Sequence, residues 1–323
     1  MLKQLPADTW NNLYYPPPDY TYFENADRFD FEPGAPAFSW KNAWWLAEAS
    51  LLAYVKKKTW DEIKAILTAA RFDDAKQIGT DPLKSTKGFI ASRSGPAPFA
   101  LVAFRGTDKD DPRNLATDED VVPQPRDGYV VHRGFGLALD QVWDTEVVPA
   151  LTAFLGLHPG APVYFTGHSL GAALATISVT RFQGPSCALY TYGSPRCGDD
   201  RFVRAVLQKT KNVFRFVNCQ DLVTQIPLEV PLEHYYRHVG DERYVNRAGI
   251  ILDHPTDFDK WLDATPAIVA HDGDAAITDI AHPANFVSLA EERGDMPDPP
   301  PFLLGNHTPA RYAIRIWNYY SAG

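Results

Sequence analysis

The sequence has few cysteines, no long apolar run and no recognisable leader. Its cysteines, Cys187, Cys197 and Cys219, are odd in number, so they cannot all pair within one chain. The longest apolar stretches, 43–54 and 161–179, are interrupted by charged or polar residues, whereas a membrane span needs roughly 20 apolar residues in a row. The first 20 residues contain no apolar core of a signal peptide. These absences predict free thiols, no transmembrane segment and a cytoplasmic location, while export without a conventional leader stays open.

Positive charge is scarce relative to negative charge. The chain has 31 Lys and Arg against 40 Asp and Glu, a formal net charge of -9. A nucleic-acid-binding surface needs clustered positive charge to displace counterions, and docking on an anionic membrane needs clustered Lys and Arg. The balance therefore argues against nucleic acid as a partner and favours an uncharged substrate. Hydrophobic residues make up 45% of the chain, which is typical of a globular protein with a sizeable core.

Sequence signatures of metal sites are also missing. The chain contains no HExxH and no CxxC motif, which are common frames for zinc. The acidic run 108–114 (DKDDPRN) lacks the central glycine and distal glutamate of a calcium loop. We therefore predict no metal site and no cofactor.

The order of expected elements indicates one α/β domain, residues 1–323. We expect an N-terminal arm over residues 1–40 and an insertion or cap at about 249–301, which is rich in Asp and Ala. Between them, strands alternate with helices, which predicts a mostly parallel central sheet with helices on both faces. The expected helices cover 42–67, 135–157 with a break at Pro149, and 169–181; the expected strands cover 88–92, 100–104, 162–166, 188–192, 213–218 and 232–239.

The sharpest motif is Gly167-His168-Ser169-Leu170-Gly171. It follows an apolar strand and opens an Ala-rich helix, which is the context of a nucleophile elbow of the form G-x-S-x-G. The turn lifts the serine hydroxyl out of the sheet, and the helix N-terminus offers N–H groups to a developing oxyanion. The motif predicts Ser169 as a nucleophile. A glycine-rich turn that binds nothing is the alternative.

A nucleophilic serine needs a base, and the base needs an orienting carboxylate, in the chain order Ser, Asp or Glu, then His. Asp221 comes shortly after the strand 213–218, and His307 lies late in the chain before a periodic segment. We predict that Asp221 orients His307, although an Asp after a strand is also a common turn cap. The remaining histidines downstream are expected to be structural or on the surface: His234, His238, His254, His271 and His282.

The oxyanion hole should combine the N–H of the residue after the nucleophile, Leu170, with a donor from an earlier loop. The turn Arg105-Gly106-Thr107 ends the strand 100–104. We predict that Thr107 supplies this second donor, through its N–H and its hydroxyl. An ordinary strand-terminating turn is the alternative.

Taken in order, these motifs resemble the class 3 (fungal-type) lipase family of the α/β-hydrolases. The resemblance runs through 42–54 (NAWWLAEASLLAY), 104–107, 114–118, 132–135 (HRGF), 167–174 (GHSLGAAL), 192–198 (YGSPRCG), 218–227 and 306–312. It implies the α/β-hydrolase fold, the triad Ser169, Asp221 and His307, and an oxyanion hole at Thr107 and Leu170. It places the start of the lid at 114–118.

The expected activity is hydrolysis of carboxylic esters, above all acylglycerols, through an acyl-enzyme. A phospholipase A1 or a short-chain esterase would use the same triad, and a non-catalytic hydrolase-fold binding module is the alternative of another class. The expected partner is a lipid or other ester, with transient contact to a lipid interface; the sequence says nothing of the oligomeric state. The lid is expected to be the hydrophilic segment 108–120, with the insertion 249–301 as the alternative.

Overall fold

The computed structural model describes residues 2–5, 9, 12, 14–16, 19–35, 37–54, 58–107, 122–227, 236–260, 263 and 305–322. The expected lid segment 108–120 lies wholly outside these residues, and so do His234, His271 and His282. Most of the expected insertion at 249–301 lies outside them as well.

A single mixed sheet runs through the described part of the chain, with the strand order β1-β2-β3-β6-β7-β8-β9-β10. The five central strands, β3 to β9 in that order, are parallel, and antiparallel pairs close both edges. The strands are β1 (Asp74–Ile78), β2 (Gly88–Arg93), β3 (Phe99–Phe104), β6 (Val163–His168), β7 (Cys187–Tyr192), β8 (Val213–Asn218), β9 (Asp241–Val245) and β10 (Ile251–Asp253). A separate hairpin joins β4 (Pro123–Arg126) to β5 (Tyr129–His132).

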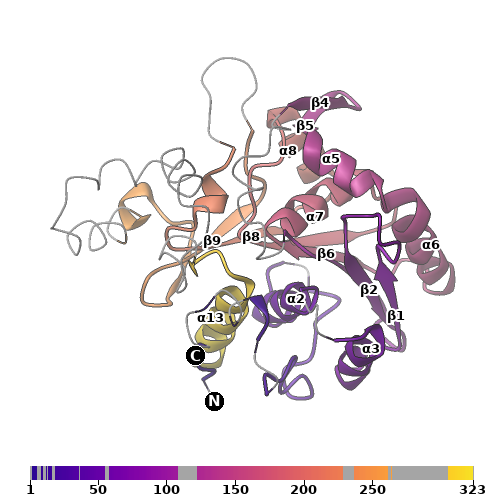
Figure 1. Cartoon of the computed structure of the whole chain (residues 1–323), viewed down its shortest axis with the longest axis horizontal. Coiled ribbons are helices and arrows are strands. Elements are labelled where there is room, and N and C mark those ends of the chain that lie inside the picture. The colour runs from indigo at the N-terminus through magenta and orange to yellow at the C-terminus, as the bar shows by residue number, and fades with distance from the viewer. Residues whose placement is uncertain are drawn as a thin grey trace.

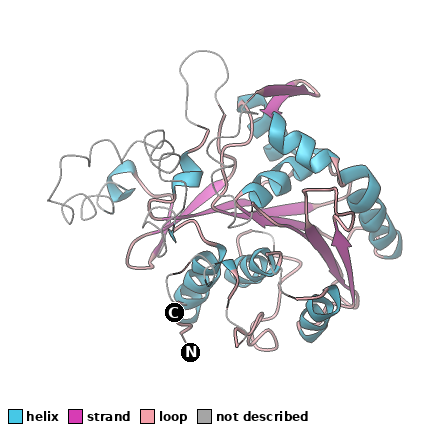
Figure 2. Ribbon diagram, viewed as in Figure 1, coloured by secondary structure: helices cyan, strands magenta, loops and turns pink. Residues whose placement is uncertain are grey.

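Helices cover both faces of this sheet (Figures 1 and 2). One face carries α2 (Trp40–Leu52), α3 (Trp60–Ala69) and α13 (Pro309–Ala322), and α13 packs along α2. The other face carries α5 (Arg133–Asp140), a π-helical turn η1 (Trp143–Val147), α6 (Val148–Leu157), α7 (Leu170–Arg181) and α8 (Asp200–Lys209). A 3-10 turn, η2 (Leu222–Gln225), follows β8. The predicted α/β-hydrolase architecture, a mostly parallel sheet with helices on both faces, is confirmed.

The core has two layers because buried strands send alternate side chains to opposite faces. In β3, Phe99, Leu101 and Ala103 join the cluster beneath α2 and α13. Ala100, Val102 and Phe104 of the same strand join the cluster beneath α5, α6 and α7. All six residues of β3 are buried, as are all six of β6, β7 and β8. This two-sided burial explains why the central strands read as continuous apolar runs.

Residues 19–35 form consecutive turns whose aromatic rings pack on the body of the domain. Phe31 stacks on Phe99 of β3 with ring centroids 4.4 Å apart, and Phe23 packs on Trp45 of α2 at 5.0 Å. The fully buried carboxylate of Glu48 accepts hydrogen bonds from the Tyr20 hydroxyl at 2.8 Å and from Lys3 Nζ at 3.2 Å. The division into one domain with an arm and an insertion stays a prediction.

The structure differs from the expected elements at three places. The expected helix 42–67 is two helices, because Thr59 and Glu62 form a reciprocal capping box that starts α3. The expected helix 135–157 is divided into α5, η1 and α6, and Pro149 lies in the first turn of α6, where its missing N–H costs nothing. In the described part of the expected strand 232–239, residues 236–239, Arg237 makes an isolated bridge to Gly198 and no strand forms.

Among the described residues, no helix is both long and apolar enough to cross a membrane.

Candidate active site

Ser169 occupies the sharp turn between β6 and α7. Its backbone has φ 60° and ψ -129°, a conformation that side-chain-bearing residues rarely adopt. The Ser169 N–H donates to the carbonyl of Tyr192 at 3.0 Å, which holds the turn against the end of β7. The side chain is 1% exposed, and its Oγ makes no hydrogen bond to any described residue.

The glycines of the motif allow this turn to form because backbones pass very close to them. A Cβ on Gly171 would lie 2.2 Å from the carbonyl oxygen of Phe104 in β3. A Cβ on Gly167 would lie 2.3 Å from the backbone of Gly171. Both distances are far below van der Waals contact, so the close packing of β3, β6 and α7 requires glycine at these two positions.

Asp221 lies just after β8 and caps the 3-10 turn η2. Its Oδ1 accepts the Val223 N–H at 3.0 Å. Its Oδ2 accepts the Tyr312 hydroxyl from α13 at 2.5 Å. The residue is 1% exposed, so these donors replace the water that the carboxylate would otherwise bind. The expected turn-capping role and the expected contact with a histidine are therefore both present.

His307 precedes α13 and meets Asp221 directly. Its Nδ1 lies 2.9 Å from both carboxylate oxygens, and the ring is almost fully buried. Since a carboxylate only accepts, Nδ1 carries the proton and Nε2 is left as the basic nitrogen. Nε2 makes no hydrogen bond to any described residue, and neither does Ser169 Oγ. The structure thus brings Asp221 and His307 together beside the elbow, without a formed Ser169–His307 hydrogen bond, which often tightens only with substrate.

The turn after β3 abuts the elbow, as predicted for the oxyanion loop. A Cβ on Gly106 would lie 3.0 Å from Ser169 Cβ and 2.5 Å from the carbonyl oxygen of His168. Thr107, the next residue, is partly exposed. Leu170 is the first residue of α7, so its N–H is one of the unsatisfied donors at that helix N-terminus. The turn that leads into Thr107 therefore lies against Ser169, and Leu170 follows Ser169 directly in the chain.

No role was predicted from the sequence for two buried side chains beside the site, Tyr54 and His168. The hydroxyl of Tyr54 lies 2.8 Å from Nδ1 of His168, the residue before the nucleophile. His168 Nε2 makes a short hydrogen bond to the carbonyl oxygen of His307. His168 is fully buried, and this burial, together with the nearby His307, holds its pKa well below the ordinary value of 6.5. No spacing rule links residues 54 and 168, although both lie within the motifs that carry the family resemblance.

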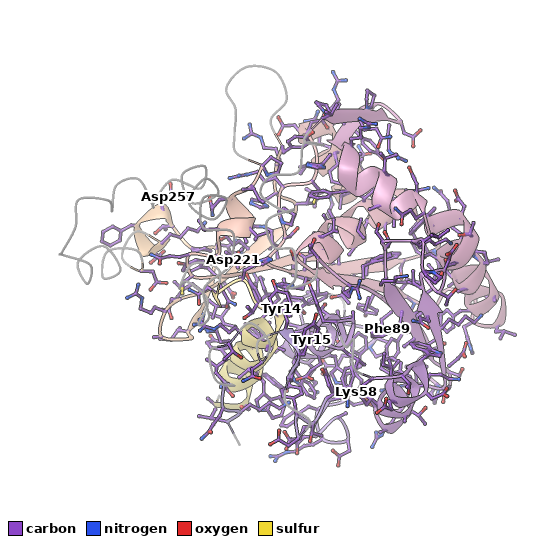
Figure 3. All side chains as sticks on the ribbon, viewed as in Figure 1. Tyr14, Tyr15, Lys58, Phe89, Asp221 and Asp257 are labelled. Atoms are coloured by element: carbon purple, nitrogen blue, oxygen red, sulfur yellow. The ribbon has the colours of Figure 1, made fainter. Side chains whose placement is uncertain are left out.

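Tyr312 is the third buried residue without a predicted role. Besides donating to Asp221, its hydroxyl accepts the Asn218 N–H at 2.9 Å, which ties the end of β8 to α13. Burial and the adjacent Asp221 carboxylate raise its pKa well above 10, so the hydroxyl remains a donor. Figure 3 shows Tyr14 and Asp221 close together. The ring centroids of Tyr14 and Tyr54 lie 5.4 Å apart.

The structure describes two of the histidines that were expected to be structural or on the surface, His238 and His254. His238 hydrogen-bonds the carbonyl of Thr224 through Nε2 at 2.8 Å, a contact of a structural residue. Burial lowers its pKa well below 6.5. His254 is exposed at the end of β10. These placements agree with the surface and structural roles expected for both.

Comparison with known proteins identifies the family. Residues 101–230 match the family described as lipase (class 3). The secreted mono- and diacylglycerol lipase A of Penicillium cyclopium is 30% identical over 225 residues, covering 68% of this chain and 70% of that one. This chain belongs to the class 3 lipase family. The predicted membership is confirmed, and the prediction of a lipase agrees with the relatives' names.

Two further comparisons agree with this membership. The secreted mono- and diacylglycerol lipase 1 of Fusarium solani is 32% identical over 165 residues, which cover 50% of this chain and 48% of that protein. The chain therefore matches about half the length of the Fusarium relative. The solved triacylglyceride lipase of Rhizomucor miehei superposes with a TM-score of 0.51 and 26% identity, covering 63% of this class 3 lipase and 77% of the other chain.

The predicted cytoplasmic location is wrong: both sequence relatives are named secreted lipases. The prediction took three free thiols as a sign of a reducing compartment, but all three are buried in this structure. Burial raises the pKa of Cys187 to about 11 and that of Cys197 to about 12, and it also raises the pKa of Cys219. Since oxidation proceeds through the thiolate, such thiols stay reduced without a reducing environment.

The low pKa of His168 makes folding stability depend on pH. In the unfolded chain this imidazole regains an ordinary pKa near 6.5, so the unfolded state binds an extra proton as the pH falls below that value. The contribution of His168 to stability is therefore fully present above about pH 6.5 and is lost progressively as the pH falls below that value. Urea unfolding at one pH above and one pH below that value should show a smaller decline in His168→Gln than in the wild type.

Thr166→Val is the matched control for this pH effect. Thr166 lies on the same strand and donates to the Tyr190 carbonyl at 2.9 Å, but it does not titrate. Loss of the Thr166 hydroxyl should lower the free energy of unfolding by a similar amount at both pH values. An equal pH dependence in the wild type and His168→Gln would contradict a neutral His168.

Proposed function

We propose that this chain is a serine hydrolase that cleaves the carboxylic esters of acylglycerols. The observation that carries the proposal is the Asp221–His307 pair, 2.9 Å apart, beside a serine held in a strained elbow. Its support from outside the chain is the membership in the class 3 lipase family and the names of the relatives. Transient contact with a lipid interface is part of this proposal.

In the proposed mechanism, Ser169 Oγ attacks the ester carbonyl while His307 Nε2 removes its proton. The negative charge on the tetrahedral oxygen is stabilised by donors at Thr107 and Leu170. The imidazolium then protonates the leaving alcohol, which departs and leaves the acyl-enzyme; water repeats the sequence and releases the fatty acid. Asp221 keeps the proton on Nδ1 and stabilises the imidazolium. The tight hydrogen bonding of Asp221 supports this orienting role.

Substitution of the triad tests the proposal. Ser169→Ala and His307→Ala should each lower kcat by about 10⁴-fold or more, and the double variant should be no worse, because the residues act as a unit. Asp221→Asn should cause a smaller loss. Ser178→Ala is the matched control, since Ser178 is a buried serine of α7, the helix that follows Ser169, and it donates to the Leu174 carbonyl. The readout is kcat on a soluble p-nitrophenyl ester.

A phosphonate directed at serine separates an enzyme from a non-catalytic binding module. Mass spectrometry should find the label on Ser169 in the wild type and no labelling in His307→Ala. Full turnover in His307→Ala, or label elsewhere, would contradict the assigned triad.

The oxyanion role of Thr107 is tested by its hydroxyl. Thr107→Val keeps the shape of the side chain and removes the donor, so kcat should fall by roughly 10²-fold with little change in KM. Thr107→Ser restores the hydroxyl and should recover most of the loss. An unchanged kcat in Thr107→Val would leave only the backbone N–H of residue 107 as a donor.

The substrate class is tested by comparing emulsified diacylglycerol, phosphatidylcholine vesicles and p-nitrophenyl esters of increasing chain length. We expect fatty acid release to be fastest from diacylglycerol, because two of the relatives are named mono- and diacylglycerol lipases. Faster release from phosphatidylcholine would instead indicate a phospholipase A1. Activity confined to soluble short esters would indicate an esterase.

A further inference from the structure

A buried chain of contacts connects three loops of the site. It starts at the turn after β3, where a Cβ on Gly106 would lie 2.1 Å from the Tyr54 hydroxyl oxygen, so this turn packs directly on the hydroxyl. It continues from that hydroxyl to His168 Nδ1 at 2.8 Å. It ends at the short contact between His168 Nε2 and the carbonyl oxygen of His307. The loops that carry Thr107, Ser169 and His307 are therefore joined through two side chains, Tyr54 and His168.

The partners fix the proton positions along this chain. A carbonyl oxygen can only accept, so His168 Nε2 must carry a proton and donate it to His307. Because burial keeps the imidazole of His168 neutral, its Nδ1 bears a lone pair and accepts from the Tyr54 hydroxyl. Burial raises the pKa of Tyr54 well above 10, so its hydroxyl keeps the proton that it donates. Each group thus has one assigned donor or acceptor role.

We propose that His168 is a positioning residue that holds the backbone of His307, with Tyr54 fixing the tautomer that makes this possible. The inference rests on the proposed function, since it assigns a role relative to His307 as the base. Two successive carbonyls of the histidine loop are anchored in this arrangement: Asn306 accepts from Asn218 Nδ2 at 3.0 Å, and His307 accepts from His168. One anchor comes from the end of β8 and the other from the end of β6.

The anchors matter because Asp221 restrains only one side of the His307 ring. The bond from Nδ1 to Asp221 still allows the imidazole to pivot about the carboxylate, which would carry Nε2 away from Ser169. Fixing the backbone carbonyl of the same residue removes that motion. A displacement of about 1 Å of a catalytic group costs roughly 10²-fold in rate, so the loss of this anchor should appear in kcat.

The test compares His168→Leu, His168→Gln and Tyr54→Phe on a soluble p-nitrophenyl ester. His168→Leu removes both ring nitrogens and should lower kcat roughly 10- to 100-fold, with KM within about twofold of the wild type. His168→Gln keeps an N–H donor near the position of Nε2 and should recover part of the loss. Tyr54→Phe should lower kcat less, and it should have no further effect in the His168→Leu background, since both act through one contact.

Thr166→Val is again the matched control, and it separates positioning from stability. Thr166 lies two residues before His168 and makes buried contacts to α2, through the Ser50 hydroxyl at 3.0 Å and the Leu46 carbonyl at 3.3 Å. Its loss should lower stability to urea while leaving kcat near the wild-type value. The second-order rate of phosphonate labelling of Ser169 should follow kcat in all variants.

The outcomes are distinct. If folded His168→Leu and Tyr54→Phe both keep kcat within about twofold of the wild type, or if Thr166→Val lowers kcat as much as they do, His168 has a structural role and the inference is overturned. Should His168→Leu fail to fold, His168→Gln and Tyr54→Phe decide by the same criterion. Ser169→Ala identifies a failure of another kind: retained hydrolysis in that variant overturns the proposed function itself.

Discussion

The strained backbone of Ser169 is the constraint on which the rest of the site depends. A residue with φ 60° and ψ -129° persists only where its surroundings allow no relaxation. Here β6 is held by parallel pairing to β3 on one side and β7 on the other, and the close approach of Gly171 to Phe104 leaves α7 no room to shift. The turn therefore projects the hydroxyl at one fixed point above the carboxyl ends of the parallel strands.

Parallel strands then bring distant residues to this point. The oxyanion turn after β3, the elbow after β6 and Asp221 after β8 all lie at the same edge of the sheet, because each follows the carboxyl end of a parallel strand. The histidine comes from outside the sheet, at the start of α13, and so needs anchors of its own. The segment 306–307 is held by hydrogen bonds from Asn218 and His168 to its two carbonyls and by the bond of the His307 ring to Asp221.

Local patterns were sufficient to predict four of the five central parallel strands and the elbow, and to propose Asp221 and His307, since each depends on a continuous stretch of sequence. The fifth central strand, β9, was not predicted. The hydrogen bond between Tyr54 and His168 joins residues 114 positions apart, and no local pattern encodes such a pairing. The edge strand β1 is largely exposed and β10 has only three residues, one of them buried, so both lack the apolar signal of a buried strand. The prediction of a cytoplasmic location was wrong for a related reason. The number of cysteines says nothing of their burial, which governs their reactivity.

Burial gives the two histidines of the site opposite tasks. His168 has both ring nitrogens paired and is held neutral, so in the proposed mechanism it does not compete with His307 for the proton of Ser169. His307 has one nitrogen paired with Asp221 and the other without a partner among the described residues. With ring centroids only 4.5 Å apart, two imidazolium ions would repel strongly. Keeping His168 neutral therefore leaves Nε2 of His307 as the nitrogen that can act as the base in the proposed mechanism.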